Sequence, residues 1–396
     1  MPRSAEYFYS HVAQTSAFPL GLEIDRAEGS WIYTVEGKKY LDLISGIAVS
    51  NTGHRHPYVL KAIQAQLDKY LHTMVYGEHI QSPQVKFAKK LSDLLPPGLD
   101  RVYFTNSGAE AVEGAMKLAK KATGRTRILS CLHAYHGSTQ GALSIMGSEQ
   151  FKNAFRPLLP DTGYLRFNDP AGLALITSQT AAVFIEPVQG EAGVILPEPG
   201  YLQSLRKKCA ETGTLLVFDE IQTGFGRTGK LFAFEKFGVI PDILLCAKGM
   251  GGGMPLGAFI SSSTLMKTLT HDPVLGHITT FGGHPVCCAA GLASLEVLEN
   301  ENVPEKVGEK ESLFVSLLKH PAIREVRHCG LLLAVEFESE ALNQRVIAAC
   351  LQRGVISDWF LFNSSSLRLA PPLTISESEI RFACSVIVES ISICTN

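Results

Sequence analysis

The chain has 396 residues, of which 45% are hydrophobic and 19% are charged, and its formal net charge is -2. This composition indicates a globular protein of more than one domain, and the near-neutral charge argues against binding to nucleic acid or to an anionic membrane surface. With no signal-like apolar core near its start, no long apolar run and no CxxC pair among nine cysteines, the sequence predicts a cytoplasmic protein with reduced, mostly buried thiols and no zinc site.

Short apolar runs mark the predicted strands. Two of them, WIYTVEG and KYLDLISGIAV, lie within the first fifty residues. From about residue 100, such runs alternate with longer amphipathic stretches, which is typical of an α/β domain around a mostly parallel sheet. The predicted strands there are VYFT at 102–105, RILS at 127–130, AAVFIEP at 181–187, LLVFD at 215–219, ILLCA at 243–247 and LGAFI at 256–260.

The helical pattern supports the same organisation. Apolar residues recur at helical spacing from Ala109 to Thr123, and Gly124 marks the end of that helix. From about residue 300, a long helical stretch precedes two short runs, a helix near 340–353 and a closing helix after Pro372, which predicts a smaller α+β domain. We therefore expect an N-terminal segment at 1–50 that packs with the small domain, a large domain at 51–299 and a small domain at 300–396.

A strand gives way to a helix at TNSGAEA, which begins at Thr105. Ser107, Gly108 and Ala109 offer backbone N–H groups and a hydroxyl at the helix N-terminus, where the helix dipole favours an anion. The alternative is an ordinary helix N-cap supplied by Ser107.

Lys248 ends the apolar run ILLCA and is followed by the glycine-rich turn GMGGG. A lysine in this position either extends to water or is partly desolvated, which lowers its pKa and makes the amine a nucleophile. Asp219 lies at another strand end, at the sheet edge where α/β proteins bind ligands. Its carboxylate needs a cation, which could be a protonated pyridine nitrogen, an arginine or a metal.

Three further charged residues stand out. Glu186 ends a predicted strand, and Glu191 follows in a glycine-flanked loop. Arg368 is isolated in an apolar run before two prolines, where a guanidinium is costly unless it meets a carboxylate. A paired structural arginine and a solvated loop glutamate are the alternatives.

In this order, the motifs resemble those of the class III, fold type I aminotransferases that use pyridoxal 5′-phosphate (PLP). The resemblance covers nearly the whole chain, through GIAVSNTGHRHP, TNSGAEAVEGAMKLA, YHGST, EPVQGEAG, FDEIQTGFGRTG, AKGMGGGMPLGA, TTFGGHP and RLAPPL. The motifs are similar to those of acetylornithine, succinylornithine, ornithine and 4-aminobutyrate aminotransferases.

The resemblance implies a role for each cofactor-site residue. Lys248 would hold PLP as an internal aldimine and, once released, move the proton between the substrate carbon and the cofactor. Asp219 would keep the pyridine nitrogen protonated, with Glu186 supporting it from behind. The remaining contacts would be Gln222 with the ring hydroxyl, Tyr135 and Ile221 on the ring faces, and Ser107, Gly108 and Ala109 with the phosphate, joined by Thr280 of the partner subunit. A shared site of this kind implies a homodimer.

The resemblance also implies a substrate side. Arg368 would receive a substrate carboxylate, and Glu191 would pair with Arg368 when the amine donor offers none. Relatives that bind a second carboxylate commonly carry arginine where this chain has Ser138, and ornithine aminotransferases carry tyrosine where it has Ile47. Either another cation replaces that arginine, with the histidines at 54, 56, 79 and 136 as poor candidates and a partner-chain arginine as another, or the enzyme prefers substrates with one carboxylate or a neutral distal group.

These features predict a transaminase that moves an amino group from an acetylornithine-, ornithine- or 4-aminobutyrate-like donor to a 2-oxo acid in amino-acid metabolism. One alternative keeps the cofactor but performs aminomutase, racemase or decarboxylase chemistry, since a fold does not fix a function. Another alternative is a non-catalytic paralogue. The pair of Arg368 and Glu191 favours a two-substrate transaminase, and the intact set around Lys248 argues against a scaffold.

Overall fold

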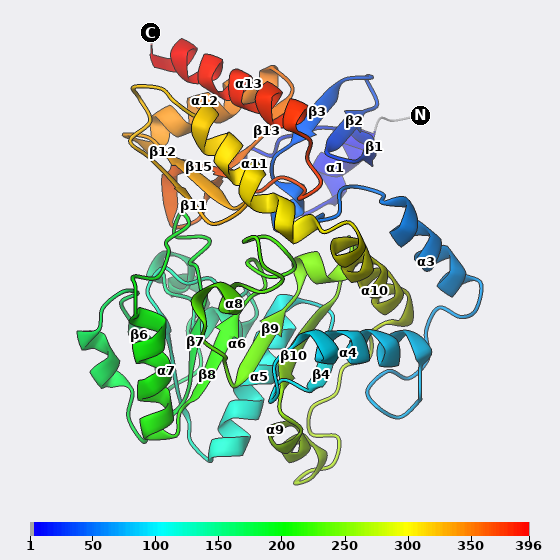
Figure 1. The fold of residues 1–396 in the computed structure, drawn as a ribbon, viewed down its shortest axis with the longest axis vertical. Helices are drawn as coiled ribbons and strands as arrows, with labels where there is room; N and C mark the ends of the chain where they lie inside the picture. Colours follow the sequence, from blue (N-terminus) through cyan, green and yellow to red (C-terminus); the bar gives the residue numbers. More distant parts are fainter. Residues whose placement is uncertain (1–3, 396) are drawn as a thin grey trace.

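The computed structural model describes residues 4–395 and has two lobes (Figure 1). The larger lobe is built on a seven-stranded sheet of order β4-β10-β9-β8-β7-β5-β6. Its strands are β4 (Arg101–Thr105), β5 (Arg127–Cys131), β6 (Thr162–Leu165), β7 (Thr180–Ile185), β8 (Leu215–Asp219), β9 (Ile243–Cys246) and β10 (Gly257–Ser261). Only β10 runs antiparallel to its neighbours, so the predicted mostly parallel α/β sheet is confirmed. Strand β6 was not among the strands predicted from the sequence.

Helices cover this sheet. The predicted helix after β4 is α5 (Gly108–Thr123), which begins with the hydroxyl of Ser107 accepting the N–H of Glu110 at 3.2 Å and ends at Gly124 with φ 66°. Ser107 is therefore the N-cap, as its alternative interpretation required. The other helices of this part are α3 (Pro57–Leu67), α4 (Ser82–Leu94), α6 (Gln140–Ser144), α7 (Tyr201–Thr212), α8 (Ala233–Phe237), α9 (Ser263–Lys267) and α10 (Pro285–Asn300).

The smaller lobe joins the two ends of the chain. One antiparallel sheet has the order β11-β12-β15-β14, and a second sheet, β1-β2-β3-β13, pairs the N-terminal β3 in parallel with the C-terminal β13. The elements are α1 (Ser4–His11), β1 (Ile24–Glu28), β2 (Trp31–Thr34), β3 (Lys39–Asp42), α11 (Val303–Leu317), β11 (Glu325–His328), β12 (Leu333–Glu336), α12 (Glu340–Gln352), β13 (Val355–Ile356), β14 (Asp358–Phe360), β15 (Asn363–Leu369) and α13 (Glu377–Thr395). We propose that the boundaries of the N-terminal segment, the large domain and the small domain lie at residues 50 and 299.

The chain leaves β3 earlier than its apolar pattern predicts. Residues 45–48 have φ between 46° and 66° and form one left-handed turn, in which the N–H of Ala48 binds the carbonyl of Ile44 at 2.9 Å. A left-handed residue other than glycine costs roughly 1–2 kcal/mol. The turn is held because the hydroxyl of Ser45 donates to the carbonyl of Ala370 at 2.6 Å, and Asp42 accepts the N–H groups of Ile44 and Ser45 at 2.8 Å each.

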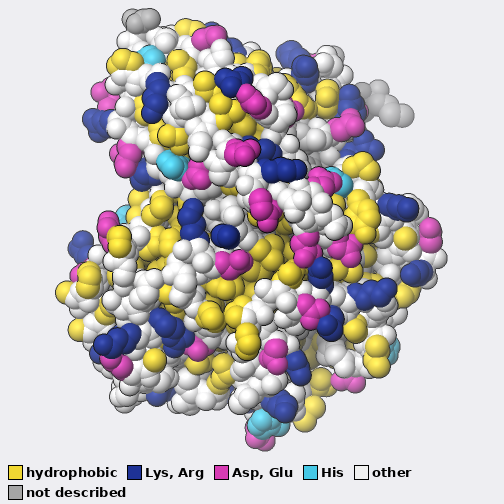
Figure 2. Space-filling view, in the orientation of Figure 1, with side chains coloured by type: hydrophobic (Ala, Val, Ile, Leu, Met, Phe, Trp, Pro, Cys, Tyr) yellow, Lys and Arg dark blue, Asp and Glu magenta, His cyan; other side chains and the backbone are white. Residues whose placement is uncertain are grey.

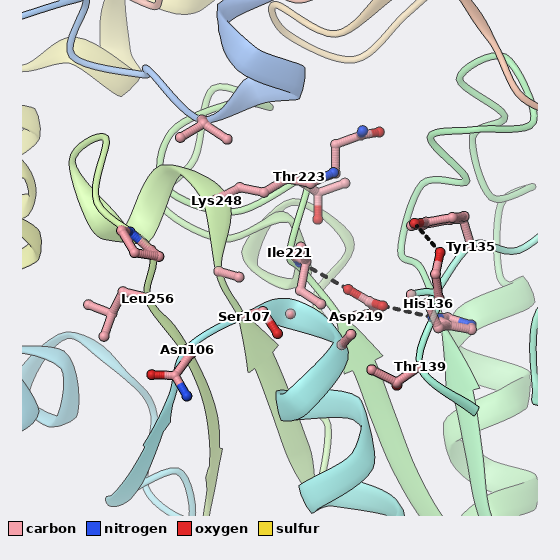
Figure 3. A pocket seen from close by; sticks show the side chains of 18 of the residues that line it. Asn106, Ser107, Tyr135, His136, Thr139, Asp219, Ile221, Thr223, Lys248 and Leu256 are labelled. Atoms are coloured by element: carbon pink, nitrogen blue, oxygen red, sulfur yellow. Dashed lines mark hydrogen bonds and ion pairs between the residues drawn. The ribbon is translucent and has the colours of Figure 1, made fainter. Parts of the chain in front are cut away.

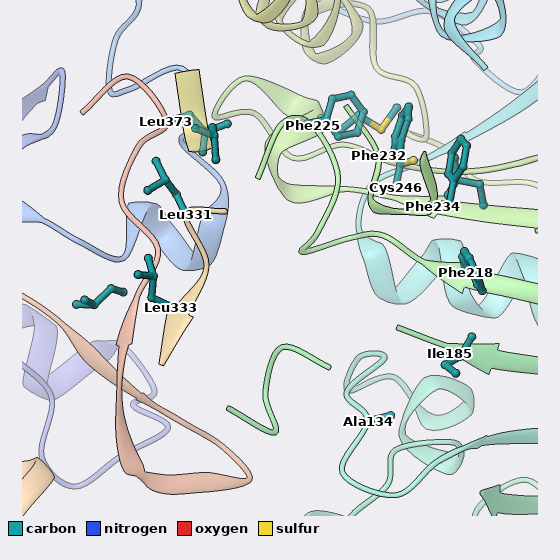
Figure 4. Close-up of a cluster of buried hydrophobic side chains, with 14 of the residues drawn as sticks. Ala134, Ile185, Phe218, Phe225, Phe232, Phe234, Cys246, Leu331, Leu333 and Leu373 are labelled. Carbon is teal, nitrogen blue, oxygen red and sulfur yellow. The ribbon is translucent and has the colours of Figure 1, made fainter. Parts of the chain in front are cut away.

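The largest apolar cluster crosses from one lobe to the other. Figure 4 shows Ile185 and Phe218 on the large sheet, Phe225 and Phe232 in the loop after β8, and Leu331, Leu333 and Leu373 in the smaller lobe. On the face shown in Figure 2, apolar side chains gather along the middle, where the lobes meet. Shared apolar burial therefore ties the lobes together.

The structure also tests the prediction of reduced, mostly buried cysteines and shows whether any helix could span a membrane. All nine cysteines are free thiols, and eight of them are buried, as the sequence predicted. No helix within residues 4–395 has the length and apolar character needed to cross a membrane.

Candidate active site

A cavity of about 780 Å³ lies at the carboxyl ends of the central strands of the large sheet (Figure 3). Asn106 follows β4, Glu186 follows β7, Asp219 ends β8 and Lys248 follows β9, so the parallel strands bring these side chains to one edge. The rest of the lining comprises Val49, Ser107–Ala109, Tyr135–Thr139, Glu191, Ile221–Thr223, Ala247 and Gly253–Leu256. This volume suits a small ligand.

Lys248 extends into this cavity from a strained backbone. Its φ is 48°, an unusual value for a residue other than glycine, and the short helix Lys248–Gly251 begins there. Burial lowers the pKa of the ammonium group, and the charge of Arg368 adds to this, whereas Glu191, Asp219 and Glu186 oppose it. The net lowering favours the neutral, nucleophilic amine.

Asp219 is paired with a histidine. Its Oδ2 atom lies 2.7 Å from Nδ1 of His136, and its Oδ1 atom accepts the N–H of Ile221 at 3.0 Å. Burial lowers the pKa of His136, but the hydrogen bond to Asp219 and the charges of Asp219 and Glu186 outweigh it, so the pKa is raised. Both side chains are buried. From the sequence, His136 was only a poor candidate for a substrate-binding cation, because its contact with Asp219 joins residues that lie far apart in the chain.

Glu186 lies behind this pair. Its carboxylate accepts the N–H of Tyr135 at 3.2 Å and that of Gly190 at 3.1 Å. Burial raises its pKa to about 8, with a further contribution from Asp219 that His136 opposes. Glu186 therefore fixes the Tyr135 backbone and keeps a proton to an unusually high pH.

Tight packing shapes the space in front of Asp219. A Cβ atom on Gly108 would lie 2.7 Å from the side chain of Ile221, and one on Gly190 would lie 1.8 Å from Oε1 of Gln222. That Oε1 atom is buried without a hydrogen-bond partner within the described chain. Across the space, the hydroxyl of Tyr135 lies 3.1 Å from that of Ser138.

These residues fit PLP. The first turn of α5 presents N–H groups to a phosphate, and the Ser107 hydroxyl keeps its hydrogen for donation. Asp219 offers a carboxylate to a protonated ring nitrogen, and Gln222 has an unused acceptor for a ring hydroxyl. Figure 3 shows Lys248, Ile221 and Tyr135 around the same space, above Ser107.

Arg368 and Glu191 form a buried ion pair beside the cavity. The NH2 group of Arg368 donates to Oε2 of Glu191, while its Nε has no partner within the described chain. The guanidinium lies 4.6 Å from the ring centroid of Phe360. Burial opposes ionisation of Glu191, but the charges of Arg368 and Lys248 lower its pKa overall. The carboxylate that the sequence required for Arg368 is present.

The other predicted substrate residues lie in different places. Ser138 lines the cavity, whereas Ile47 packs against Tyr40, Ile44 and Ile356 and is not among the lining residues. Val49, which follows the left-handed turn, lines the cavity.

No replacement for the missing arginine appears in the described chain. Among the lining residues within 4–395, Lys248 alone is a lysine or arginine. Of the four histidines, His54 binds Asp42 at 2.8 Å, His56 binds Glu301 at 3.2 Å, His79 is exposed and His136 binds Asp219. Thr280 is exposed and is not among the residues that line the cavity of its own chain.

Comparison with known proteins gives a consistent result. Residues 12–391 match the family model described as aminotransferase class-III. An acetylornithine aminotransferase of Methanosarcina mazei is 41% identical over 374 residues, which cover 93% of this chain and 91% of the relative. A putrescine aminotransferase of Pectobacterium atrosepticum is 39% identical, over 89% of this chain and 79% of the relative.

Solved structures agree. The ornithine aminotransferase of Toxoplasma gondii superposes with a TM-score of 0.90 at 32% identity, over 99% of this chain and 96% of that chain. A transaminase from the marine bacterium Virgibacillus gives a TM-score of 0.93 at 28% identity, over 99% of each chain.

Proposed function

The chain belongs to the class III aminotransferases and is a PLP-dependent transaminase, and from this premise we propose that Lys248 carries the cofactor and moves the proton during transfer of an amino group to a 2-oxo acid. The observation that supports this most directly is a lysine of lowered pKa on the same cavity as Asp219 and the first turn of α5.

In this proposal, each residue that surrounds the cofactor has one role. Bound PLP withdraws electrons from the substrate carbon that carries the amine. The Nζ atom of Lys248 takes the proton from that carbon and returns it at the other end of the transfer. Asp219 maintains the positive charge on the ring nitrogen, and His136 holds its carboxylate in place.

At the substrate end, Arg368 receives the carboxylate of the 2-oxo acid and Glu191 moves aside for it. When a donor without a carboxylate in that position is bound, Glu191 returns and neutralises Arg368. We propose a donor of the acetylornithine, ornithine or 4-aminobutyrate type, with the reacting amine at the end of a chain. Ser138 and the similarity to a putrescine aminotransferase support a distal group without a strongly held carboxylate.

The experiment is a panel of donors added to the PLP-loaded protein without acceptor. Acetylornithine, ornithine, 4-aminobutyrate and putrescine are compared by the conversion of the cofactor absorbance to that of the pyridoxamine form. Borohydride reduction and peptide mapping are expected to place the label on Lys248. A label on another lysine would contradict the proposed role.

We also propose a homodimer with a shared site. Two adjacent segments expose large apolar side chains, namely Leu71, Met74, Ile80, Val274, Leu275, Ile278 and Phe281. The rings of His72 and Phe281 lie 4.8 Å apart, which places the segments side by side. Thr280 belongs to this surface and would reach the phosphate of the other chain. Sedimentation is expected to show a dimer, and a stable monomer with full PLP affinity would overturn this arrangement.

A further inference from the structure

One oxygen atom of Glu191 has two partners. Its Oε2 atom accepts from the guanidinium of Arg368 and also from the backbone N–H of Leu361 at 3.1 Å. The other oxygen, Oε1, lies 3.4 Å from Nε2 of Gln222. Moving this oxygen out of the position that a substrate carboxylate would take at Arg368 therefore also disturbs its bond to Leu361.

Leu361 belongs to the tight turn that joins β14 to β15, the strand that carries Arg368. The next residue, Phe362, donates its N–H to the carbonyl of Glu191 at 3.1 Å. Its ring packs edge-on against Phe151 at 5.6 Å and His133 at 6.3 Å, measured between centroids. The turn is thereby held against the larger lobe, with the Leu361 N–H directed at Glu191.

We propose that the backbone N–H of Leu361 is a latch that determines how readily Arg368 accepts a substrate carboxylate. This inference rests on the proposed roles of Arg368 and Glu191. The latch stabilises the state in which Glu191 covers Arg368, so it weakens the binding of carboxylates relative to that of amines without one.

The state with Glu191 in place leaves Arg368 only partly satisfied. Glu191 engages the NH2 group, and the buried Nε has no partner within the described chain. An incoming carboxylate can use both N–H positions in the two-pronged geometry that guanidinium groups favour. The exchange gains a hydrogen bond at Arg368 and loses the contacts of Glu191 with Leu361 and Gln222. The strength of the Leu361 bond therefore sets part of the balance between the two states.

Leu361→Pro removes the latch without altering any charge. Neither Leu361 nor Phe362 has positive φ, and proline is favoured at the first central position of a type I turn. The preceding residue, Phe360, is in a strand, as a residue before proline prefers. The matched control is Leu361→Ala, which shortens the same side chain but keeps the N–H.

Two measurements test the latch on the PLP-loaded protein. Titration calorimetry with glutarate, a carboxylate that cannot react, is expected to give a Kd about three- to tenfold lower for Leu361→Pro than for Leu361→Ala. The KM for 2-oxoglutarate is expected to fall by a similar factor, while the KM for putrescine stays within about twofold. Equal glutarate affinities in the two folded variants would overturn the proposal.

Further variants distinguish a failure of the latch from a failure of the proposed role of Arg368. Arg368→Met is expected to weaken glutarate at least about tenfold, and an unchanged Kd would refute the role of Arg368 itself. If Arg368→Met behaves as expected but the proline and alanine variants agree, only the latch is wrong. Should the proline variant not fold, Glu191→Asp replaces it, because the shorter carboxylate cannot reach both partners. Its glutarate Kd is expected to fall, and an unchanged or higher value would refute the latch.

Discussion

Two parts of the candidate site differ in how their residues are held. We call them the cofactor end, around Asp219, and the carboxylate end, at Arg368 and Glu191. At the cofactor end, Asp219, His136 and Glu186 are buried at the ends or in the loops of the large sheet, and their hydrogen bonds need not break during turnover. At the proposed carboxylate end, Arg368 comes from β15 of the smaller lobe and Glu191 from a loop of the larger one, and the function we propose requires this ion pair to separate. In this proposal the large sheet holds the cofactor-binding residues in place, whereas the contact between the lobes carries an ion pair that a substrate carboxylate can replace.

The largest expected effect tests the cofactor end. Lys248→Ala is expected to reduce kcat by about four orders of magnitude or more, because the covalent and proton-transfer roles are lost together. PLP is expected to remain bound through the first turn of α5 and Asp219, as measured by absorbance and equilibrium dialysis. Lys267→Ala, at an exposed position on α9, is the control and retains activity. Substantial turnover by the Lys248 variant would show that the reaction does not take place at the cofactor end.

An intermediate effect tests the carboxylate end. Ser138→Arg adds a guanidinium to the cavity, so the preference for 2-oxoglutarate over pyruvate, measured as the ratio of kcat/KM, is expected to rise roughly ten- to a hundredfold. Ser138→Gln adds length without charge and serves as the control. If the wild type already prefers 2-oxoglutarate strongly and arginine adds nothing, another cation, such as one from the partner subunit, already binds the second carboxylate.

The smallest effect concerns pH and returns to the cofactor end. Burial raises the pKa of Glu186 to about 8, above its unfolded value, so the stability that its proton contributes is complete at low pH and is lost as pH rises towards 8. Glu186→Gln cannot ionise. Its Tm relative to wild type is expected to increase by roughly a few degrees between pH 5.5 and 8.5, measured by thermal unfolding. A difference in Tm that does not change with pH would show that Glu186 is ionised throughout.

Sequence patterns predicted several of the residues that meet at one edge of the large sheet. Asp219 ends β8 and Lys248 follows β9, and the apolar runs before them identify both the strands and the edge at which those residues meet. The helix after β4 follows from its apolar spacing and its flanking Ser107 and Gly124. Local patterns suffice because the parallel sheet itself brings these positions together.

The carboxylate end was less accessible to sequence reasoning. The left-handed turn at residues 45–48 has the apolar composition of a strand, and contacts with distant residues such as Ala370 determine its conformation. The resemblance to ornithine aminotransferases implied that Ile47 lies at the substrate, and in the structure its side chain packs against a neighbouring apolar cluster. The bond from Leu361 to Glu191 involves a backbone group, which leaves no signature in side-chain identity.

Arg227 connects the segments that complete the cavity. It is fully buried, and its guanidinium donates to the carbonyls of Leu331 and Pro371 and to Oδ1 of Asn51. The side chain of Asn51 in turn packs against Gly249, the neighbour of Lys248. During synthesis on the ribosome, the segment around residue 50 therefore has no completed docking site until the chain has been made beyond residue 371. A chain that ends before residue 371 would contain every residue that lines the cavity but would lack part of the hydrogen-bonded anchor that holds Asn51 against Gly249.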